Sequence, residues 1–382
     1  MSRGLIRCRQ PPLFFSTDLG ETAVKNKVDL RFTLPQRKSA PSISNVLSLL
    51  DGKVVNRQEN FGQSTIEAWK RDAALGSPEA QYELAKSLTA GNPASSDNRA
   101  AVKWLRKAAD KEHAASQHLL GVLIARAQGV RANPEQAVAL FRAAAIMGNA
   151  DAQYDLGRAL TWGFGVDVNL KEALTWFRLA GAQGHLQAQL AVGLAYSHGQ
   201  GCEPDLIQAA SWLRKAALSH EAQAAFALGM LFLRPDNPQA DNKDAYRWIG
   251  EAARAGLADA QYELALFFWS GRAVTRSSTQ AFDWAMRAAG QNHIRALLFL
   301  SKLFETGDGC QVNRCGAYAV SLRAMNLTQN QEDNSLSQEC RLRARELTAL
   351  ITTSELRAAE MLLSDNIRTK DLLSELIPGV RR

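Results

Sequence analysis

The sequence has few of the residues and runs that define several large protein classes. Five cysteines in 382 residues are too few for a disulfide scaffold, and they favour a reducing compartment. No stretch approaches the roughly 18 apolar residues of a membrane-spanning helix. The N-terminus lacks the long apolar segment of a secretory signal peptide, because Pro11 and Pro12 interrupt the only candidate. We therefore expect a cytoplasmic protein without a transmembrane segment.

Basic charge is not concentrated on the long middle part of the chain. The formal net charge is +7, but residues 1–61 alone hold ten Lys/Arg and five Asp/Glu. Residues 327–382 hold eight Lys/Arg and nine Asp/Glu, which leaves 45 − 10 − 8 = 27 basic and 38 − 5 − 9 = 24 acidic residues in between. A nucleic-acid-binding domain gathers basic residues on its folded body. The sequence therefore predicts no nucleic-acid partner.

The residue combinations of common catalytic sites are also missing. There is no G-x-S-x-G, H-E-x-x-H or G-x-x-x-x-G-K-[ST], and the SDN at Ser364 has no Ser-x-x-Lys to complete a β-lactamase motif. Cys310 and Cys315 lie five residues apart, without the tight spacing of a zinc-binding pair. These absences predict a protein that is not an enzyme and that holds no metal or cofactor.

What the sequence does contain is a 36-residue period. Segments such as WLRKAA from Trp104, WFRLAG from Trp176 and WLRKAA from Trp212 belong to seven copies that start 36 residues apart. A second pattern, AQYELA or AQYDLG, recurs at the same period. Such self-similarity is the signature of a repeat architecture. Alanine fills two positions in all seven copies: Ala101, Ala137, Ala173, Ala209, Ala245, Ala281 and Ala317, and Ala108, Ala144, Ala180, Ala216, Ala252, Ala288 and Ala324.

Each repeat is predicted to form two amphipathic helices. Ala152, Leu156 and Leu160 stand at i, i+4 and i+8, which places them on one face of a first helix. Ala173 and Phe177 stand at i and i+4 in the segment that follows, on one face of a second helix. One such hairpin cannot bury its apolar stripe alone, whereas stacked copies can. The period therefore predicts an α-solenoid.

Small residues inside the first helix indicate a close neighbour. Because a glycine inside a helix costs about 1 kcal/mol relative to alanine, its recurrence predicts a second helix that passes too close for a larger side chain. Segments such as GFGVDVN and GQGCEPD predict the turn between the two helices. The stretch from Arg234 to Ala245 lacks both loop glycines, so we expect an altered loop there. The small residues of the first helix, one in each repeat, are Ala85, Gly121, Gly157, Gly193, Gly229, Ala265 and Ser301.

Isolated reactive side chains are explained by their places in the repeat. Cys202 and Cys310 occupy the slot that holds Val166, so they are predicted to plug the loops as small apolar groups. His185 and His293 occupy equivalent slots that open a first helix. A repeat position explains these two histidines better than a shared metal site does.

The copy that runs from Ala152 to Gly184, which includes ALTWGFGVDVNLKEALTWFRLAGAQG, resembles the Sel-1-like repeat, a relative of the tetratricopeptide repeat. The resemblance covers roughly residues 62–326. It implies an all-α fold, a right-handed α-solenoid of about seven 36-residue helix hairpins. It also implies an adaptor role toward protein or peptide partners, which it does not identify. Some bacterial members carry a disulfide in each repeat and are linked to β-lactam binding, but this sequence lacks the paired cysteines.

The flanks differ from the array. Residues 1–61 have no period and include the linker-like PQRKSAPSIS, so we predict a mostly disordered tail. Residues 327–382 are predicted to cap the array, because a terminal repeat needs a polar outer face. Two helices are expected there, over Ser335–Ile351 and Thr353–Leu363, and Ser354 is a candidate N-cap of the second.

The capping region also carries a run of arginines. Arg341, Arg343 and Arg345 alternate along the first expected helix, with Glu339 and Glu346 beside them. Mixed charge of this kind is typical of a solvated helix face. We therefore interpret the run as a solvated face and not as a binding patch.

The remaining candidate site is the concave surface that first helices line in helical repeat proteins. Aromatic and Arg side chains are typical anchors of protein interfaces. Tyrosines in the Ala-x-Tyr-x-Leu pattern are also explained by packing, whereas Lys86, Arg126, Arg158, Trp162 and Trp269 break the repeat pattern. The predicted partner-binding residues are Lys86, Arg126, Tyr154, Arg158, Trp162, His198, Tyr262 and Trp269.

These observations favour a non-catalytic, monomeric scaffold that binds a protein or peptide on its concave face. One alternative is a secreted bacterial effector, or a secretion-linked regulatory factor, that uses residues 1–61 as an export signal independent of a signal peptide. A hydrolase acting on cell-wall or β-lactam substrates fits less well, because the sequence offers no nucleophile for it.

Overall fold

The computed structural model describes residues 63–89, 96–328, 335–364 and 368–376. These residues form eighteen α-helices and no strand, which confirms the predicted all-α fold. The predicted disorder of residues 1–61 lies outside the described residues. In chain order the helices are α3 (Gln63–Ala74), α4 (Pro78–Thr89), α5 (Ser96–Ala109), α6 (Ala114–Ala125), α7 (Pro134–Ile146), α8 (Ala150–Trp162), α9 (Leu170–Ala182), α10 (Leu186–His198), α11 (Leu206–Leu218), α12 (Ala222–Phe232), α13 (Asn242–Arg254), α14 (Ala258–Ser270), α15 (Ser278–Gly290), α16 (Ile294–Thr306), α17 (Arg314–Thr328), α18 (Ser335–Thr348), α19 (Thr353–Ser364) and α20 (Thr369–Leu376).

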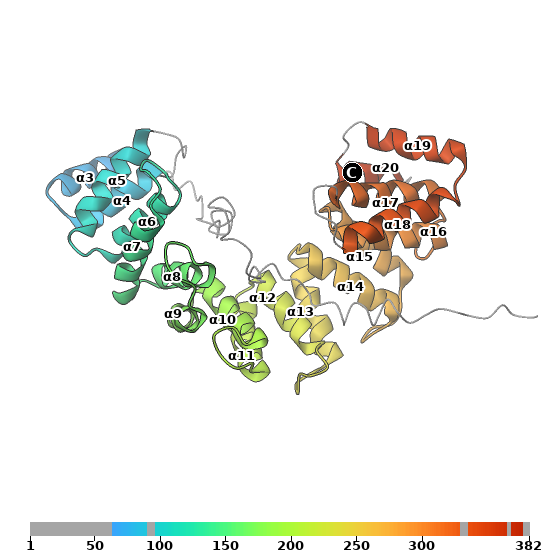
Figure 1. Cartoon of the computed structure of the whole chain (residues 1–382), viewed down its shortest axis with the longest axis horizontal. Coiled ribbons are helices and arrows are strands. Elements are labelled where there is room, and N and C mark those ends of the chain that lie inside the picture. The colour runs from blue at the N-terminus through green and yellow to red at the C-terminus, as the bar shows by residue number, and fades with distance from the viewer. Residues whose placement is uncertain (1–62, 90–95, 329–334, 365–367, 377–382) are drawn as a thin grey trace, which may run out of the picture. The chain divides into compact units, whose positions relative to one another are not determined.

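Successive helices pack as hairpins, and each hairpin packs against the next (Figure 1). The pairs run from α4 with α5 to α16 with α17, and we call the members of a pair its first and second helix. Each second helix also packs against the first helix of the following pair. The α3 helix packs on α4 in the same manner. This arrangement is the α-solenoid that the period predicts.

Small side chains at the helix contacts make this close packing possible. All fourteen repeat alanines named above are buried, and none is more than 2% exposed. A Cβ placed on Gly157 would lie 2.6 Å from a ring carbon of Phe177, and one on Gly193 would lie 2.6 Å from Leu213. The prediction of a close second helix is therefore confirmed, because the intruding groups belong to the second helix of the same repeat.

The helix ends follow the predicted turn chemistry. Gly163, Gly199 and Gly307 end their first helices in the left-handed conformation, with φ of +71°, +69° and +77°. Asn169 and Asp205 begin the next second helices, and their side chains accept hydrogen bonds from backbone N–H groups of the first turn. The glycine turn and the polar N-cap together reverse the chain within each repeat.

A buried glutamine secures the joint between neighbouring repeats, a role that the sequence did not indicate. In five repeats the glutamine side chain donates a hydrogen bond to a backbone carbonyl eight residues earlier, in the preceding second helix. Each of these carbonyls also accepts a hydrogen bond from the backbone N–H three residues later, so the glutamine supplies a second donor at the helix end. The pairs are Gln81 with Ala73, Gln117 with Ala109, Gln153 with Ala145, Gln189 with Gly181, and Gln261 with Ala253.

The divergent fifth loop leaves the array unbroken, as predicted. The α12 helix ends at Phe232 and α13 begins at Asn242, and the two helices pack as in the other repeats. Asn237 is buried, and its amide donates a hydrogen bond to the Leu231 carbonyl at 2.8 Å. Side-chain hydrogen bonding therefore closes a loop that has lost its glycines.

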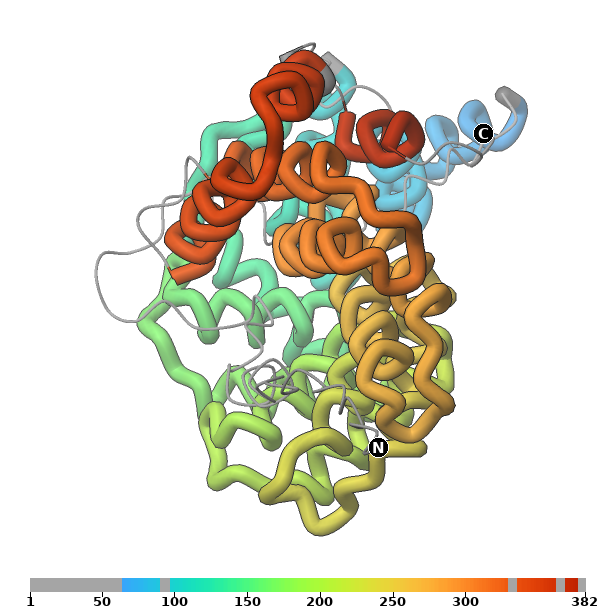
Figure 2. The backbone as a smooth tube through the Cα atoms, turned by 90° about the vertical axis from the view of Figure 1, so that its right-hand side faces the viewer, coloured from blue at the N-terminus to red at the C-terminus, as the bar shows by residue number. Residues whose placement is uncertain are grey.

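The C-terminal helices pack on the last hairpins (Figure 2). The α18 and α19 helices pack on α17, and α20 packs on α15. The sequence predicted the first two helices of this group but not α20. The predicted N-cap of α19 at Ser354 is wrong by two residues, because the Glu355 backbone N–H donates to Thr352 Oγ1 while Glu355 accepts from the Thr352 N–H.

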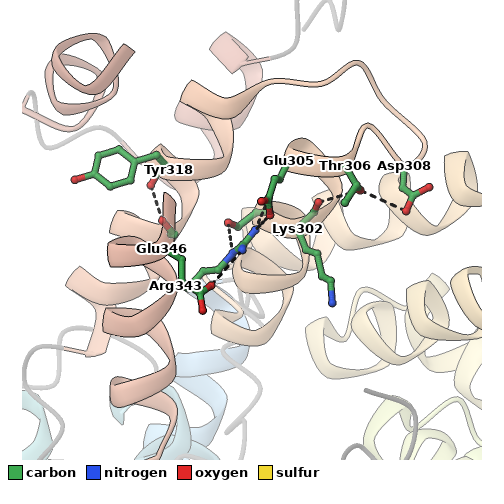
Figure 3. Close-up of polar contacts among 9 residues, drawn as sticks. Lys302, Glu305, Thr306, Asp308, Tyr318, Arg343 and Glu346 are labelled. Atoms are coloured by element: carbon green, nitrogen blue, oxygen red, sulfur yellow. Dashed lines mark hydrogen bonds and ion pairs between the residues drawn. The ribbon is translucent and has the colours of Figure 1, made fainter. Parts of the chain in front are cut away.

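The arginine run of α18 has two environments. Arg341 and Arg345 are exposed, as predicted. The prediction is wrong for Arg343, which forms an ion pair with Glu305 of α16 and donates to Ser301 Oγ at 3.2 Å (Figure 3). Ser301 occupies the slot that holds a small residue in every repeat, so Arg343 can reach the α16 backbone. This contact joins the C-terminal helices to α16, the first helix of the seventh repeat.

Candidate protein-binding face

First helices of neighbouring repeats contact one another at several points of the array. The α4 helix contacts α6, and α10 contacts α12. Polar groups also bridge them: His118 Nε2 lies 2.9 Å from Asp155 Oδ2, and Arg234 donates to the Ser197 carbonyl at 3.0 Å. We define the first-helix face as the positions that Tyr154, Asp155, Arg158 and Trp162 occupy in α8, with their equivalents in the other first helices.

One cluster of polar residues, the α6–α8 cluster, comprises His118, Tyr154, Asp155 and Arg158. Arg158 is only 5% exposed, its Nη1 lies 3.6 Å from Asp155 Oδ1, and its guanidinium lies 5.5 Å from the centre of the Tyr154 ring. Asp155 therefore contacts a histidine on one side and an arginine on the other. The predicted residue Arg158 is engaged within this network, which leaves little of its surface for a partner.

The predicted tyrosines pack against the histidines that open the next first helix. Tyr154 stacks on His185 with ring centres 4.5 Å apart, and burial raises the pKa of Tyr154. His185 Nδ1 accepts a hydrogen bond from the Ala188 N–H, and its Nε2 lies 3.4 Å from Asp151. His293 likewise caps α16, which confirms that these histidines serve a repeat position.

Four predicted residues lie at or beside the C-terminal ends of first helices. Trp162 and His198 are the last residues of α8 and α10, and Arg126 is the C-cap of α6. These three share one slot of the repeat, so they form a column along one edge of the first-helix face. Trp162 is half-buried and His198 is exposed. Lys86, in the slot of Arg158, is exposed in α4.

A second cluster, the α14–α16 cluster, comprises Tyr262, Glu263, Trp269, His293 and Phe299. Tyr262 lies 4.9 Å from His293 and 6.3 Å from Phe299 between ring centres, and Trp269 meets Phe299 edge to face at 5.8 Å. Burial raises the pKa of Glu263 to about 7. The sequence places Glu263 on the face with Tyr262 and Trp269 but names only the latter two as binding residues, and it gives no sign of the raised pKa of the Glu263 carboxyl.

An apolar stretch separates the two clusters. The slots of Tyr154 and Arg158 hold Leu190 and Leu194 in α10, and both leucines are buried. In α12 the slot of Tyr154 holds Phe226, which is also buried. In the slots of Tyr154, Asp155 and Arg158, the α10 and α12 helices therefore carry no charged side chain between the two clusters.

Metal-ligand clusters and membrane-spanning helices are both absent from the described residues. No three His, Cys, Asp or Glu side chains among them are placed to hold a metal ion. None of the described helices is long and apolar enough to span a membrane. Cys202 and Cys310 are half-buried loop plugs, as predicted, and burial raises the pKa of both thiols.

Comparison with known proteins relates these hairpins to one repeat family. The model of the Sel1 repeat matches six stretches, residues 78–113, 114–149, 150–185, 186–219, 222–257 and 258–293, which contain the helix pairs from α4–α5 to α14–α15. The seventh pair, α16 with α17, continues the same packing beyond the matched stretches.

One solved structure shares this fold, and two others are similar to the chain with lower TM-scores. A Sel1 repeat protein from Oxalobacter formigenes is 24% identical, with a TM-score of 0.58 over 67% of this chain and 98% of that one. A protective antigen from uropathogenic Escherichia coli with an SLR fold is 20% identical over 83% and 82% of the two chains, with a TM-score of 0.36. An immunity protein from Pseudomonas aeruginosa is 20% identical over 62% and 82%, with a TM-score of 0.33. The search of curated proteins found no match to this sequence.

Proposed function

The chain belongs to the Sel1 repeat family, whose repeats form scaffolds for protein interactions, and on that premise we propose that it is a non-catalytic adaptor that binds a protein or peptide along the first-helix face. This face corresponds to the concave side of a helical repeat array. Neither enzymatic activity nor a cofactor is part of the proposal.

One observation carries the proposal: the packing positions repeat while the first-helix face varies. The repeat alanines are identical in all seven copies. The slot of Tyr154, in contrast, holds Tyr82, His118, Leu190, Phe226, Tyr262 and Leu298 in the other copies. Packing between helices explains why the alanines are the same in every repeat. It does not explain why the residue in the slot of Tyr154 differs from repeat to repeat. A face with its own residue in each repeat supports recognition of an extended partner.

The edge column offers the most accessible candidate anchors. Trp162 and His198 lie in consecutive repeats at one edge of the face, and at least part of each side chain contacts solvent. Aromatic anchors of this kind contribute strongly to protein interfaces. Arg158 is a poor choice for a test, because reversing its charge would place two negative groups against each other in the α6–α8 cluster.

Site-specific photo-cross-linking in the native cell tests the proposed face. A photoreactive benzoylphenylalanine replaces Trp162 or His198 in separate full-length variants. Matched controls place it at Leu179 or Leu218, which lie on second helices and are 46% and 65% exposed. We expect both face positions to cross-link one and the same protein that the controls do not. Cross-links from the second-helix positions alone would refute the proposed face.

We further propose that the protein is a cytoplasmic monomer. The absence of a spanning helix among the described residues and the low cysteine content support this placement. Cell fractionation and light scattering of the purified chain test the two parts separately. The export alternative depends on residues 1–61, outside the described residues, and recovery of the full-length protein from the medium would favour it.

A further inference from the structure

The carboxyl group of Glu263, in α14, forms no ion pair with any described residue. It is half-buried on the first-helix face, and no described residue forms a hydrogen bond or ion pair with it. Burial raises its pKa to about 7, because removal from water disfavours the charged form. An unpaired acid in such a place costs folding free energy when it ionises.

Packing does not require an acid at this position. The equivalent slot holds Leu119 in α6, Ala191 in α10, Ala227 in α12 and Phe299 in α16. Four of the seven repeats thus fill the slot with an apolar side chain. The other three repeats carry the acids Glu83, Asp155 and Glu263, so the hairpin tolerates an acid in this slot but does not require one.

Aromatic residues occupy neighbouring positions of the first-helix face. Phe299 occupies the slot of Glu263 in the next first helix, and Tyr262 directly precedes Glu263 in α14. Phe299 in turn contacts Tyr262 and Trp269 edge to face, at 6.3 and 5.8 Å. The buried Trp269 Nε1 has no hydrogen-bond acceptor among the described residues. The cluster thus combines an unpaired acceptor, an unpaired donor and several ring faces.

The charged groups around Glu263 do not neutralise it. Arg295 of α16 and Arg272 of the following loop act on it from a distance and favour its ionised form, but neither forms an ion pair with it. Asp259 on the same helix opposes ionisation and is paired with His293 at 3.1 Å. Glu339 of α18 adds further negative potential at the neighbouring Tyr262.

We propose that the α14–α16 cluster binds a lysine or arginine side chain of the peptide partner, with Glu263 as the counter-charge and the aromatic rings beside it. The inference rests on the proposed adaptor function and specifies the chemistry of its ligand. Charge complementarity carries the choice of occupant, because a cation gives Glu263 the ion pair it lacks. Cations also bind favourably over aromatic ring faces.

The test uses the full-length chain and a phage-displayed library of random 12-residue peptides. The matched control for Glu263→Gln is Glu251→Gln, which removes an exposed carboxyl group of the second helix α13. We expect the unmodified chain to select peptides with Lys or Arg beside an apolar residue. A synthetic copy of the selected peptide should bind Glu263→Gln at least fivefold more weakly and Glu251→Gln unchanged.

The pH dependence of the same peptide gives a second readout. With a pKa of about 7, ionised Glu263 rises from about a tenth of the free protein at pH 6 to about nine-tenths at pH 8. The affinity of the unmodified chain should therefore increase up to about tenfold over this range. Equal pH dependence in the unmodified chain and in Glu263→Gln would overturn the assignment of the counter-charge to Glu263.

The outcomes separate this inference from the adaptor function. Selected peptides without basic residues, or equal affinity for the unmodified chain and Glu263→Gln, would overturn the inference while peptide binding itself still stood. If Trp162→Ala also weakens binding of the selected peptide, that loss would support the adaptor function independently of Glu263. Basic peptides that bind only after removal of residues 1–62 would show that this segment of the chain is the occupant, and would overturn the assignment to a separate partner.

Discussion

Replacement of Gly157 by alanine tests how closely the two helices of a repeat approach each other. The added methyl carbon would lie 2.6 and 2.7 Å from two ring carbons of Phe177. Because carbon atoms in contact prefer about 3.5–4.0 Å, the overlap is roughly 1 Å. The overlap is large enough that Phe177 or the helix itself must shift.

Two effects of the substitution oppose each other. Alanine is about 1 kcal/mol more favourable than glycine inside a helix. Overpacking of a filled core costs about 1–3 kcal/mol. Because Phe177 is buried and cannot swing into solvent, we expect the packing cost to prevail. Gly157→Ala should lower the free energy of unfolding by about 1 kcal/mol.

The assay is urea unfolding of the full-length chain, with Gly290→Ala as the matched control. Gly290 ends α15, and a Cβ there would meet no atom within 4 Å. This control should stabilise the protein by about 0.5 kcal/mol or more, as helix propensity alone predicts. If Gly157→Ala stabilises the chain as much as Gly290→Ala does, the close approach of the helices is refuted.

A second background isolates the contact itself. Phe177→Ala removes the ring, and Gly157→Ala should then become neutral or stabilising in that background. The chain already contains this combination, since Ala265 and Ala285 occupy the two equivalent slots in the sixth repeat. A double-mutant cycle with no coupling between the two substitutions would contradict the packing argument.

Three further predictions concern buried polar groups. In urea unfolding, Gln153→Leu should destabilise the chain by about 1–2 kcal/mol more than Gln189→Leu. The reason is that Gln153 Oε1 accepts a hydrogen bond from Gln183, whereas Gln189 Oε1 has no partner among the described residues. Equal losses of unfolding free energy in the two variants would contradict this. The pKa of Glu263 is raised to about 7, above its usual 4.5, so ionisation destabilises the fold as pH rises through this interval. Glu263→Gln should therefore match the unmodified chain at pH 4 and exceed its stability at pH 8 by on the order of 1–3 kcal/mol; no difference at pH 8 would show that the carboxyl is well solvated. Arg343→Gln should speed hydrogen exchange in α18 but not in α8, because it removes the ion pair to α16; unchanged exchange in α18 would show that the ion pair does not hold the cap.

The repeat architecture could be predicted in detail because its causes are local and periodic. The identical alanines at two positions of the repeat indicate where neighbouring helices contact each other. The glycines inside the first helices indicate that the two helices of a repeat approach closely. Loop glycines and polar N-caps mark helix ends through backbone geometry that depends on neighbouring residues alone. The structure confirms each of these expectations at Gly157, Gly163 and Asn169.

The pairing of side chains across repeats could not be predicted with the same success. Arg158 was selected because it breaks the repeat pattern, yet the pattern does not reveal that Asp155 and Tyr154 engage it. Arg343 was assigned to solvent because acids flank it in sequence, whereas its ion pair is with Glu305, 38 residues earlier. The buried glutamines carried a visible signal, the repeated Ala-Gln pair, whose hydrogen-bonding role requires knowledge of the preceding helix end.

The raised pKa of the Glu263 carboxyl could not be predicted for a related reason. Glu263 lies in a slot that also holds Glu83 and Asp155, so its residue type alone does not distinguish it. Only its surroundings do, since Asp155 contacts His118 and Arg158 while Glu263 has no bonded counter-charge. Burial and partner geometry are properties of the folded array, and they define the candidate site.

A crystal structure of the full-length chain with a selected basic peptide would test the central claim most directly. We predict a peptide that lies along the first helices and places a lysine or arginine nitrogen within hydrogen-bonding distance of the Glu263 carboxylate. A peptide seated on the second helices, for example on α9 and α11, would contradict the assignment of partner binding to the first-helix face.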